Sequence, residues 1–130
     1  MAKVTGIGGI FFKTKDTSRT KDWYQKHLGI EPDAGGYVTF RWKDKDNPEV
    51  DGSTAWSPFK EDTTYFNPSD KPYMINYRVD DLDGMLAQLR EAGVQVDDKL
   101  EEDDDYGRFG WAMDVDGARI ELWEPPKKKG

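Results

Sequence analysis

The sequence predicts an α+β fold of two tandem strand-helix-strand-strand-strand modules, because the residues that mark the starts of helices and the ends of strands occur twice at similar spacing. Asp81 follows Asp16 by 65 residues, and each begins a helical pattern directly after a strand pattern. Pro125 follows Pro58 by 67 residues, and each proline stands two residues after a tryptophan. A repeat of fixed period indicates a duplicated architecture. We therefore expect a single domain over residues 1–130, with one module at about residues 4–60 and another at about residues 72–126.

The first module is predicted to begin with a glycine-rich strand over residues 4–13. A glycine inside a strand often marks the close approach of another backbone or of a ligand. Asp16 is a good N-cap for the helix that follows, and Gly29 suits the left-handed conformation at its end. Pro58 is expected to end the module's last strand. The two later strands are expected at residues 37–42 and 53–56.

The second module is predicted to repeat this plan, beginning with a strand over residues 73–79. Asp81 caps a helix whose apolar residues recur at helical spacing, and Gly93 ends it. Asp116 and Gly117 form a strong signal for a two-residue hairpin turn. The later strands are expected at residues 94–96, 109–115 and 118–123.

Composition restricts the class of protein. Five Trp, six Tyr and six Phe supply large side chains for a core, although apolar residues make up only 35% of the chain. Without cysteine there is no disulfide, no thiolate nucleophile and no Cys-ligated zinc. No apolar run reaches the roughly 18 residues of a membrane helix, and no leader pattern opens the chain. We expect a cytoplasmic protein without a membrane partner.

The net charge of -7 is concentrated in one segment. Residues 97–105 contain seven carboxylates and one lysine, and we interpret this run as a solvated loop. The basic run at residues 127–129 is interpreted as a solvated tail. Nucleic-acid binding needs clustered Lys and Arg, so the charge pattern argues against such a partner.

Three phrases carry a resemblance to a known family, and they lie at residues 22–29 (DWYQKHLG), 79–83 (VDDLD) and 114–125 (DVDGARIELWEP). Together with the duplicated plan, they resemble the vicinal oxygen chelate superfamily, which includes glyoxalase I, extradiol dioxygenases and bleomycin-resistance proteins. The resemblance extends over essentially the whole chain. It implies a curved, cup-shaped, mostly antiparallel sheet with the helices outside. Because this scaffold supports many activities, the resemblance indicates the fold more than the function.

The resemblance also implies a metal where four strand positions converge. These positions correspond to Gly9, Thr54, Met74 and Glu121, and only Glu121 is a ligand of the family type. The chain's one histidine, His27, lies at a helix end, where an interaction with the helix dipole is its ordinary role. We therefore expect no metal cofactor, with a divalent metal held by Glu121 as the alternative.

Strand alternation predicts which side chains face the cup. Met74, Asn76 and Arg78 share one face of their strand, opposite a face suited to packing on a helix. Glu121 and Trp123 occupy the corresponding face of the last strand. The alternative interpretation is that these faces simply meet solvent, as the outer face of an antiparallel sheet often does.

The expected pocket combines aromatic walls with a few polar contacts, as small-molecule sites usually do. The ligand-binding candidates are Phe11, Trp56, Met74, Asn76, Arg78, Trp111, Glu121 and Trp123. For any single tryptophan, a place in the core is an equally good interpretation.

Three hypotheses for the function follow. The first is a glyoxalase/bleomycin-resistance-like protein that binds a small aromatic or cationic molecule without a catalytic metal. The second is a lyase, isomerase or dioxygenase-like enzyme in which Glu121 is the catalytic base or a metal ligand. The third is a structural or partner-binding module. We also expect a homodimer, since twofold pairing would cover exposed apolar surface. The identity of the ligand does not follow from the sequence.

Overall fold

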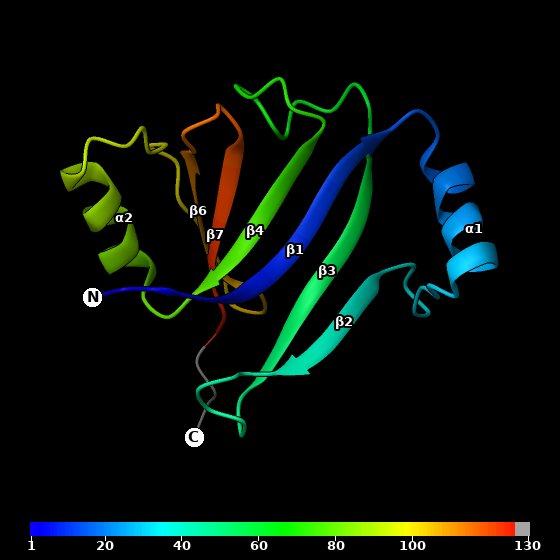
Figure 1. Cartoon of the computed structure of the whole chain (residues 1–130), viewed down its shortest axis with the longest axis horizontal. Helices are drawn as coiled ribbons and strands as arrows, with labels where there is room; N and C mark the ends of the chain where they lie inside the picture. Colours follow the sequence, from blue (N-terminus) through cyan, green and yellow to red (C-terminus); the bar gives the residue numbers. More distant parts are fainter. Residues whose placement is uncertain (127–130) are drawn as a thin grey trace.

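A computed structural model describes residues 1–126, so the tail predicted at residues 127–129 lies outside the described residues. The elements, in chain order, are β1 (Val4–Thr14), α1 (Thr17–Leu28), β2 (Val38–Lys43), β3 (Asp51–Lys60), β4 (Tyr73–Val79), α2 (Leu82–Glu91), β5 (Glu101–Asp103), β6 (Gly107–Met113) and β7 (Arg119–Glu124). The strands of residues 1–126 form one mixed sheet in the order β2-β3-β1-β4-β7-β6-β5 (Figure 1). The predicted α+β fold is confirmed.

The two modules meet at the centre of the sheet, where β1 and β4 pair in antiparallel fashion. In each module the first strand also pairs in parallel with the last, β1 with β3 and β4 with β7. Ile10 pairs directly with Ile75, and these residues are 65 positions apart, the offset of the sequence repeat. The twofold axis that relates the modules therefore passes through this pair, and the modules pair within one chain.

Both helices begin and end where the sequence predicts. The Asp16 side chain accepts a hydrogen bond from the Arg19 backbone N–H at 3.1 Å, and Gly29 adopts φ 70° after α1. The Asp81 side chain caps α2 by accepting from the Gly84 backbone N–H at 3.0 Å. Each cap satisfies a backbone donor that lacks a partner within the helix, so these boundaries are set locally.

The helices lie on the same face of the sheet, which we call the outer face. Tyr24 of α1 packs edge-on against Trp56 of β3, and α2 packs against Tyr77 and Val79 of β4. Ile10 links these contacts, because it pairs with both Trp56 and Ile75, and directly paired residues share a face. On the opposite face, which we call the inner face, the described residues place no helix.

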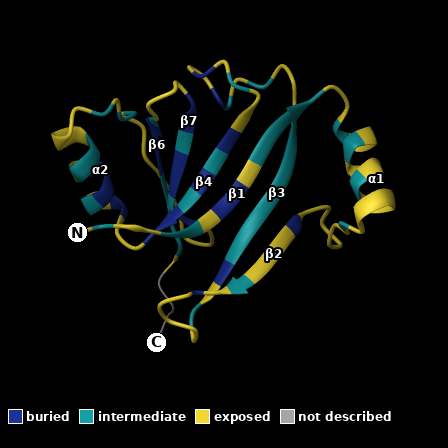
Figure 2. Cartoon of the chain, viewed as in Figure 1, coloured by how far each residue is buried: buried dark blue, intermediate teal, exposed yellow. Residues whose placement is uncertain are grey.

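The core is unevenly divided between the modules (Figure 2). Beneath α2, the buried apolar residues are Val79, Leu82, Met85, Leu86 and Leu122. Each such side chain contributes about 1.5–3 kcal/mol when fully buried. By contrast, α1 has no buried residue and is held by the aromatic cluster of Phe12, Tyr24 and Trp56. The second module thus contains most of the apolar core.

Two predicted strand ends are wrong. Pro58 does not end β3, which continues to Lys60. The reason is that β2 pairs with β3 only as far as Trp56, so the missing N–H of Pro58 costs no hydrogen bond on that side. The hairpin at Gly117 also has three residues in its loop rather than two, because the Asp114 backbone N–H donates to the Ala118 carbonyl at 2.8 Å.

The acidic segment at residues 97–105 is not the free loop that its charge predicts. Its centre forms β5, which pairs with β6. Glu102 accepts from Arg108 at 3.0 Å, and Asp97 accepts from Arg119 at 2.6 Å. Cations outside the segment therefore neutralise part of its charge. The strand expected at residues 94–96 is reduced to one bridge between Val96 and Ala112.

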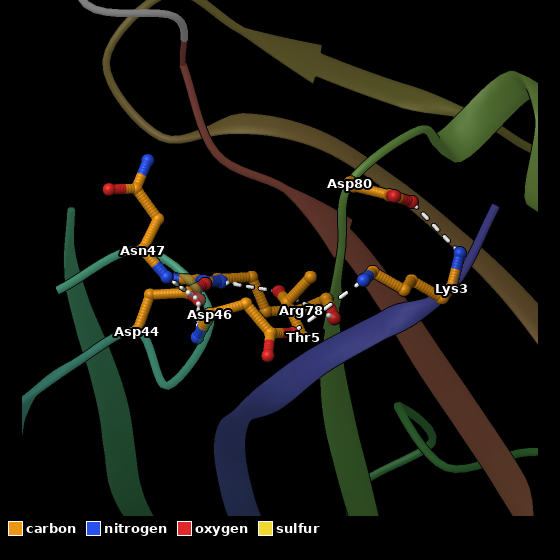
Figure 3. Close-up of polar contacts among 7 residues, drawn as sticks. All are labelled: Lys3, Thr5, Asp44, Asp46, Asn47, Arg78 and Asp80. Atoms are coloured by element: carbon orange, nitrogen blue, oxygen red, sulfur yellow. Dashed lines mark hydrogen bonds and ion pairs between the residues drawn. The ribbon is translucent and has the colours of Figure 1, made fainter.

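A buried ion pair attaches the loop between β2 and β3 to the central strands (Figure 3). The Arg78 Nε donates to the Thr5 hydroxyl at 2.6 Å, and its Nη2 donates to the Asp44 carboxylate. The same carboxylate accepts from the backbone N–H groups of Asp46 at 2.9 Å and Asn47 at 3.1 Å. Asp44 therefore holds both the turn and the guanidinium.

This arrangement predicts how stability depends on pH. The pKa of Asp44 is lowered from its ordinary value of 3.8, first by the hydrogen bond from the Asp46 backbone and also by Arg78. A carboxylate with a depressed pKa adds stability above its unfolded pKa, and this stability is lost as the pH falls through the folded value. Asp44→Asn should therefore lower the urea midpoint at pH 7, and the difference from the parent should disappear in acid, as measured by circular dichroism between pH 7 and pH 2.

Asp46→Asn is the matched control, because it lies in the same turn and keeps the backbone N–H that Asp44 accepts. Its own ion pair with Lys3 spans 3.6 Å between exposed side chains, so we expect no change in the urea midpoint. A deficit for Asp44→Asn that stayed constant across the pH range would contradict this interpretation.

Candidate functional site

The inner face carries a row of paired positions across four strands. Gly9 of β1 pairs with Asn76 of β4, which pairs with Glu121 of β7. Glu121 in turn pairs with Trp111 of β6. Because directly paired residues point to the same face, the amide, the carboxylate and the indole lie side by side.

A bulge in β1 lets two side chains lie against the strand. Gly8 is the extra residue between the paired positions Ile7 and Gly9. A Cβ on Gly8 would lie 2.2 Å from the Asn76 Oδ1 and 2.8 Å from the Trp123 ring. Glycine is therefore required for this close approach, as the glycine-rich first strand predicts.

Glu121 is a buried carboxylate with three donors. Its Oε1 accepts from the Asn76 Nδ2 at 2.6 Å, and its Oε2 accepts from the Trp111 Nε1 at 2.9 Å and from the Tyr65 hydroxyl. These bonds hold the side chain in place, and only 2% of the residue is exposed. Hydrogen bonds to an ionised group are among the strong ones, which offsets the cost of burying the charge.

Tyr65 reaches Glu121 from the connection between β3 and β4. Burial raises the pKa of Tyr65 above its usual range, and the negative charge of Glu121 raises it further. The phenol therefore stays protonated at neutral pH and acts as a donor. Its ring stacks on Phe59 at 5.6 Å between centroids, which holds the hydroxyl in place.

A cavity of about 620 Å³ opens on the inner face beside this row. It is lined by Gly8, Phe11, Asp33, Tyr37, Val38, Thr39, Ser53, Ala55, Ser57, Asn76, Tyr106, Phe109, Glu121 and Trp123. Phe109 and Trp123 are nearly parallel, with ring centroids 6.5 Å apart. The lining comes from both modules, so the whole curved sheet forms the site.

The sequence match identifies the family. The profile described as Glyoxalase/Bleomycin resistance protein/Dioxygenase superfamily matches residues 6–122. The chain belongs to this superfamily. The resemblance seen in the sequence is thereby confirmed over nearly the whole chain.

Solved structures agree with this assignment at the level of the fold. A variant of the Streptomyces coelicolor methylmalonyl-CoA epimerase, in complex with 2-nitronate-propionyl-CoA, superimposes with a TM-score of 0.69 at 19% identity, covering 96% of this chain and 100% of that chain. The Mycobacterium tuberculosis methylmalonyl-CoA epimerase gives a TM-score of 0.59 at 22% identity, covering 96% and 91%. A superfamily member from Vibrio splendidus 12B01 gives 0.58 at 12% identity, covering 95% and 99%. No curated protein sequence matches the chain.

The residues at the superfamily's metal positions do not fit a divalent metal. Gly9 has no side chain, and Met74 offers only a thioether inside an apolar cluster. The Thr54 hydroxyl donates to the Ile7 carbonyl and accepts from the Trp42 indole at 2.8 Å, on the face opposite Ala55. Glu121 already accepts three hydrogen bonds. These four positions therefore lack the set of ligands that a divalent metal needs.

Another metal centre in the described part of the chain would need its remaining His, Asp and Glu side chains. Residues 1–126 contain no group of three or more His, Asp or Glu side chains placed to hold an ion. His27 lies on α1 and packs against Trp23, with ring centroids 4.9 Å apart.

Four of the eight predicted ligand-binding residues line the cavity, and they are Phe11, Asn76, Glu121 and Trp123. Strand alternation places Asn76, Glu121 and Trp123 correctly, because β4 and β7 are regular in this region. Asn76 and Glu121 form the floor, and Phe11 and Trp123 belong to the aromatic wall.

The other four predicted residues lie elsewhere. Trp56 is on the outer face, where it packs against Phe12 and Tyr24. Met74 and Trp111 are buried in a cluster with Phe66. Arg78 is engaged by Asp44 and Thr5 and does not reach Glu121. Of these, only Trp111 contributes to the site, because it donates to Glu121.

Several residues that line the cavity were not predicted from the sequence, and they lie on β3 and at the rim of the cavity. Ser53, Ala55 and Ser57 alternate along β3, and this period-2 pattern of small side chains was a usable signal for an inner face. By contrast, Tyr37 and Tyr106 come from segments whose positions depend on the tertiary fold. Tyr65 gave no local signal either.

The hydrogen bond from Tyr65 to the buried carboxylate should be measurable. Tyr65→Phe leaves the ring in place and removes the donor, so we expect a loss of about 1.5–3 kcal/mol in the free energy of unfolding, the usual value for a bond to a charged group. Urea denaturation followed by fluorescence measures it. Tyr106→Phe is the control, because Tyr106 is 68% exposed and should change stability negligibly. Equal effects of the two substitutions would refute the role assigned to Tyr65.

Proposed function

We propose that the protein binds a small organic molecule in the inner-face cavity without a metal. The observation that carries the proposal is the cavity itself, which has about 620 Å³, aromatic walls and a few fixed polar groups. Ligand sites typically enclose about 300–1,000 Å³ and have this composition. A purely structural module is disfavoured, because the space is not filled by the protein's own side chains.

The state of Glu121 favours binding over catalysis. A general base must reach a substrate proton with a free lone pair. Three hydrogen bonds from the protein occupy three of the roughly four acceptor positions of the Glu121 carboxylate, and the residue is only 2% exposed. The lyase or isomerase hypothesis based on Glu121 is therefore the weaker one. The epimerases share less than 25% identity with this chain, so their activity does not transfer with the fold.

A ligand screen with a metal control tests the proposal. We expect the melting temperature to be unchanged after dialysis against EDTA, and to rise with some members of a panel of small planar compounds. Metal analysis should find no stoichiometric Zn²⁺, Ni²⁺ or Fe²⁺. About one tightly bound metal ion per chain would contradict the metal-free proposal.

Two tryptophan variants locate the binding. Trp123→Leu removes part of the aromatic wall and should weaken any hit at least tenfold in isothermal titration calorimetry, since ring contacts dominate such sites. Trp23→Leu is the control, because Trp23 lies on α1 and is 53% exposed. Equal affinities for Trp123→Leu and the parent would place the ligand outside the cavity.

We also propose that the chain forms a homodimer through its outer face. Ile7, Ile10, Phe40 and Tyr73 lie on this face and remain exposed, beyond the area that the helices cover. Such a group of large apolar side chains is typical of an interaction surface. A second copy is the partner most often found, and twofold symmetry would bury the same patch on both chains.

The oligomeric state can be tested by charge insertion. Ile10→Glu places a carboxylate at the centre of the patch and should convert the dimer to a monomer in sedimentation velocity at micromolar concentration. Val115→Glu is the matched control, since Val115 is 97% exposed in the turn between β6 and β7 and should leave the dimer intact. A monomeric parent protein would overturn the proposal.

A cytoplasmic location also stays a prediction, and the described residues 1–126 include no helix able to cross a membrane.

A further inference from the structure

The charges that line the cavity have one sign. Among the residues of 1–126 that line it, Asp33 and Glu121 are acidic, and none is Lys, Arg or His. The chain as a whole contains 19 Lys and Arg residues, so their absence from the lining is a property of the site. Anionic ligands such as nucleotides or CoA derivatives carry phosphates, which are normally met by Lys or Arg. The lining therefore disfavours an anion.

The aromatic faces of the cavity are not occupied by the protein's own cations. Five of the lining residues are aromatic, namely Phe11, Tyr37, Tyr106, Phe109 and Trp123. Within the described part of the chain, the cations that lie over rings use Trp42, Trp111 and Phe66 instead. The five cavity rings thus keep the negative faces that attract a cation.

A buried acceptor on the floor points to the same ligand chemistry. The Asn76 Nδ2 donates to Glu121, and this bond fixes the orientation of the amide. The Asn76 Oδ1 therefore points away from the Glu121 carboxylate. Among residues 1–126 this Oδ1 has no hydrogen-bond partner, and Asn76 is only 3% exposed. The partial negative charge of this oxygen is not balanced by a donor, and in a site of low dielectric such a charge favours a cation nearby.

The rim supplies the second carboxylate. One oxygen of Asp33 accepts from the backbone N–H groups of Gly35 at 2.9 Å and Tyr37 at 3.0 Å. This turn keeps the acid beside Tyr37, which is also part of the lining. The floor and the rim of the cavity are therefore both negative, with aromatic rings between them.

We propose that the ligand is an organic ammonium ion, a protonated amine with a compact aromatic or apolar body. The inference rests on the proposed function, because it specifies the ligand class of the same cavity. The ammonium group would lie between the aromatic faces and the carboxylates, and its N–H would donate to the Asp33 carboxylate at the rim. The apolar body would fill the space beside Phe11 and Phe109.

A charge series with one common ring tests the proposal. The probes are benzylammonium, benzyl alcohol and benzoate, titrated calorimetrically into the full chain at low salt. We expect benzylammonium to bind at least tenfold more tightly than benzyl alcohol, and benzoate to show no measurable binding. The affinity for benzylammonium should fall as NaCl is raised, because salt screens the attraction.

Two substitutions of equal charge change separate a local from a general electrostatic effect. Asp33→Asn keeps an oxygen for the turn and removes the rim charge, so it should weaken benzylammonium at least threefold and leave benzyl alcohol unaffected. Asp116→Asn removes the same charge in the turn between β6 and β7, outside the lining, and should have no effect. Equal weakening by both variants would overturn the proposed role of the rim.

Benzyltrimethylammonium serves as a fourth probe, since it keeps the charge and has no N–H. It should bind more weakly than benzylammonium, because it cannot donate a hydrogen bond to the Asp33 carboxylate. Equal affinity for benzyl alcohol and benzylammonium would overturn the ammonium assignment, while the proposed function would stand. Failure of every probe would also overturn the assignment, whereas the planar-compound panel decides the proposed function independently.

Discussion

The antiparallel pairing of β1 with β4 is the constraint on which the rest of the structure depends. The twofold axis at the Ile10–Ile75 pair is perpendicular to the sheet, so it places equivalent parts of both modules on the same face. Each module joins its parallel strands by a crossover that contains a helix. Both helices must then cover the outer face. In residues 1–126 no helix covers the inner face, which is why a cavity can form there from both modules.

The second determining interaction is the buried carboxylate of Glu121. Taking such a charge out of water is costly unless it is fully hydrogen bonded. The three donors come from β4, from β6 and from the connection before β4, so the carboxylate connects segments that are far apart in sequence. In this chain the residue at the superfamily's acidic position organises the floor of the site through hydrogen bonds from the protein itself.

Local signals predicted the elements well, because each depends on a few neighbouring residues. Asp16, Gly29 and Asp81 act on backbone groups within one turn, so their roles could be inferred directly. The faces of Asn76 and Glu121 follow from alternation in regular strands. Trp56 and Trp123 were harder, since both precede a proline by two residues and yet face opposite sides of the sheet. What separates them is the register of each strand with its neighbours, which composition does not encode.

The uneven core gives the two sides of the cavity different compliance. α2 buries Leu82, Met85 and Leu86, whereas α1 buries no side chain. Segments that bury little apolar surface open locally at a lower cost in free energy than the core around them. The cavity therefore has a stiff wall, formed by β4, β6 and β7, and a compliant wall, formed by β2 and β3. Opening of the compliant wall therefore costs less free energy than opening of the stiff wall, which holds Glu121 in place.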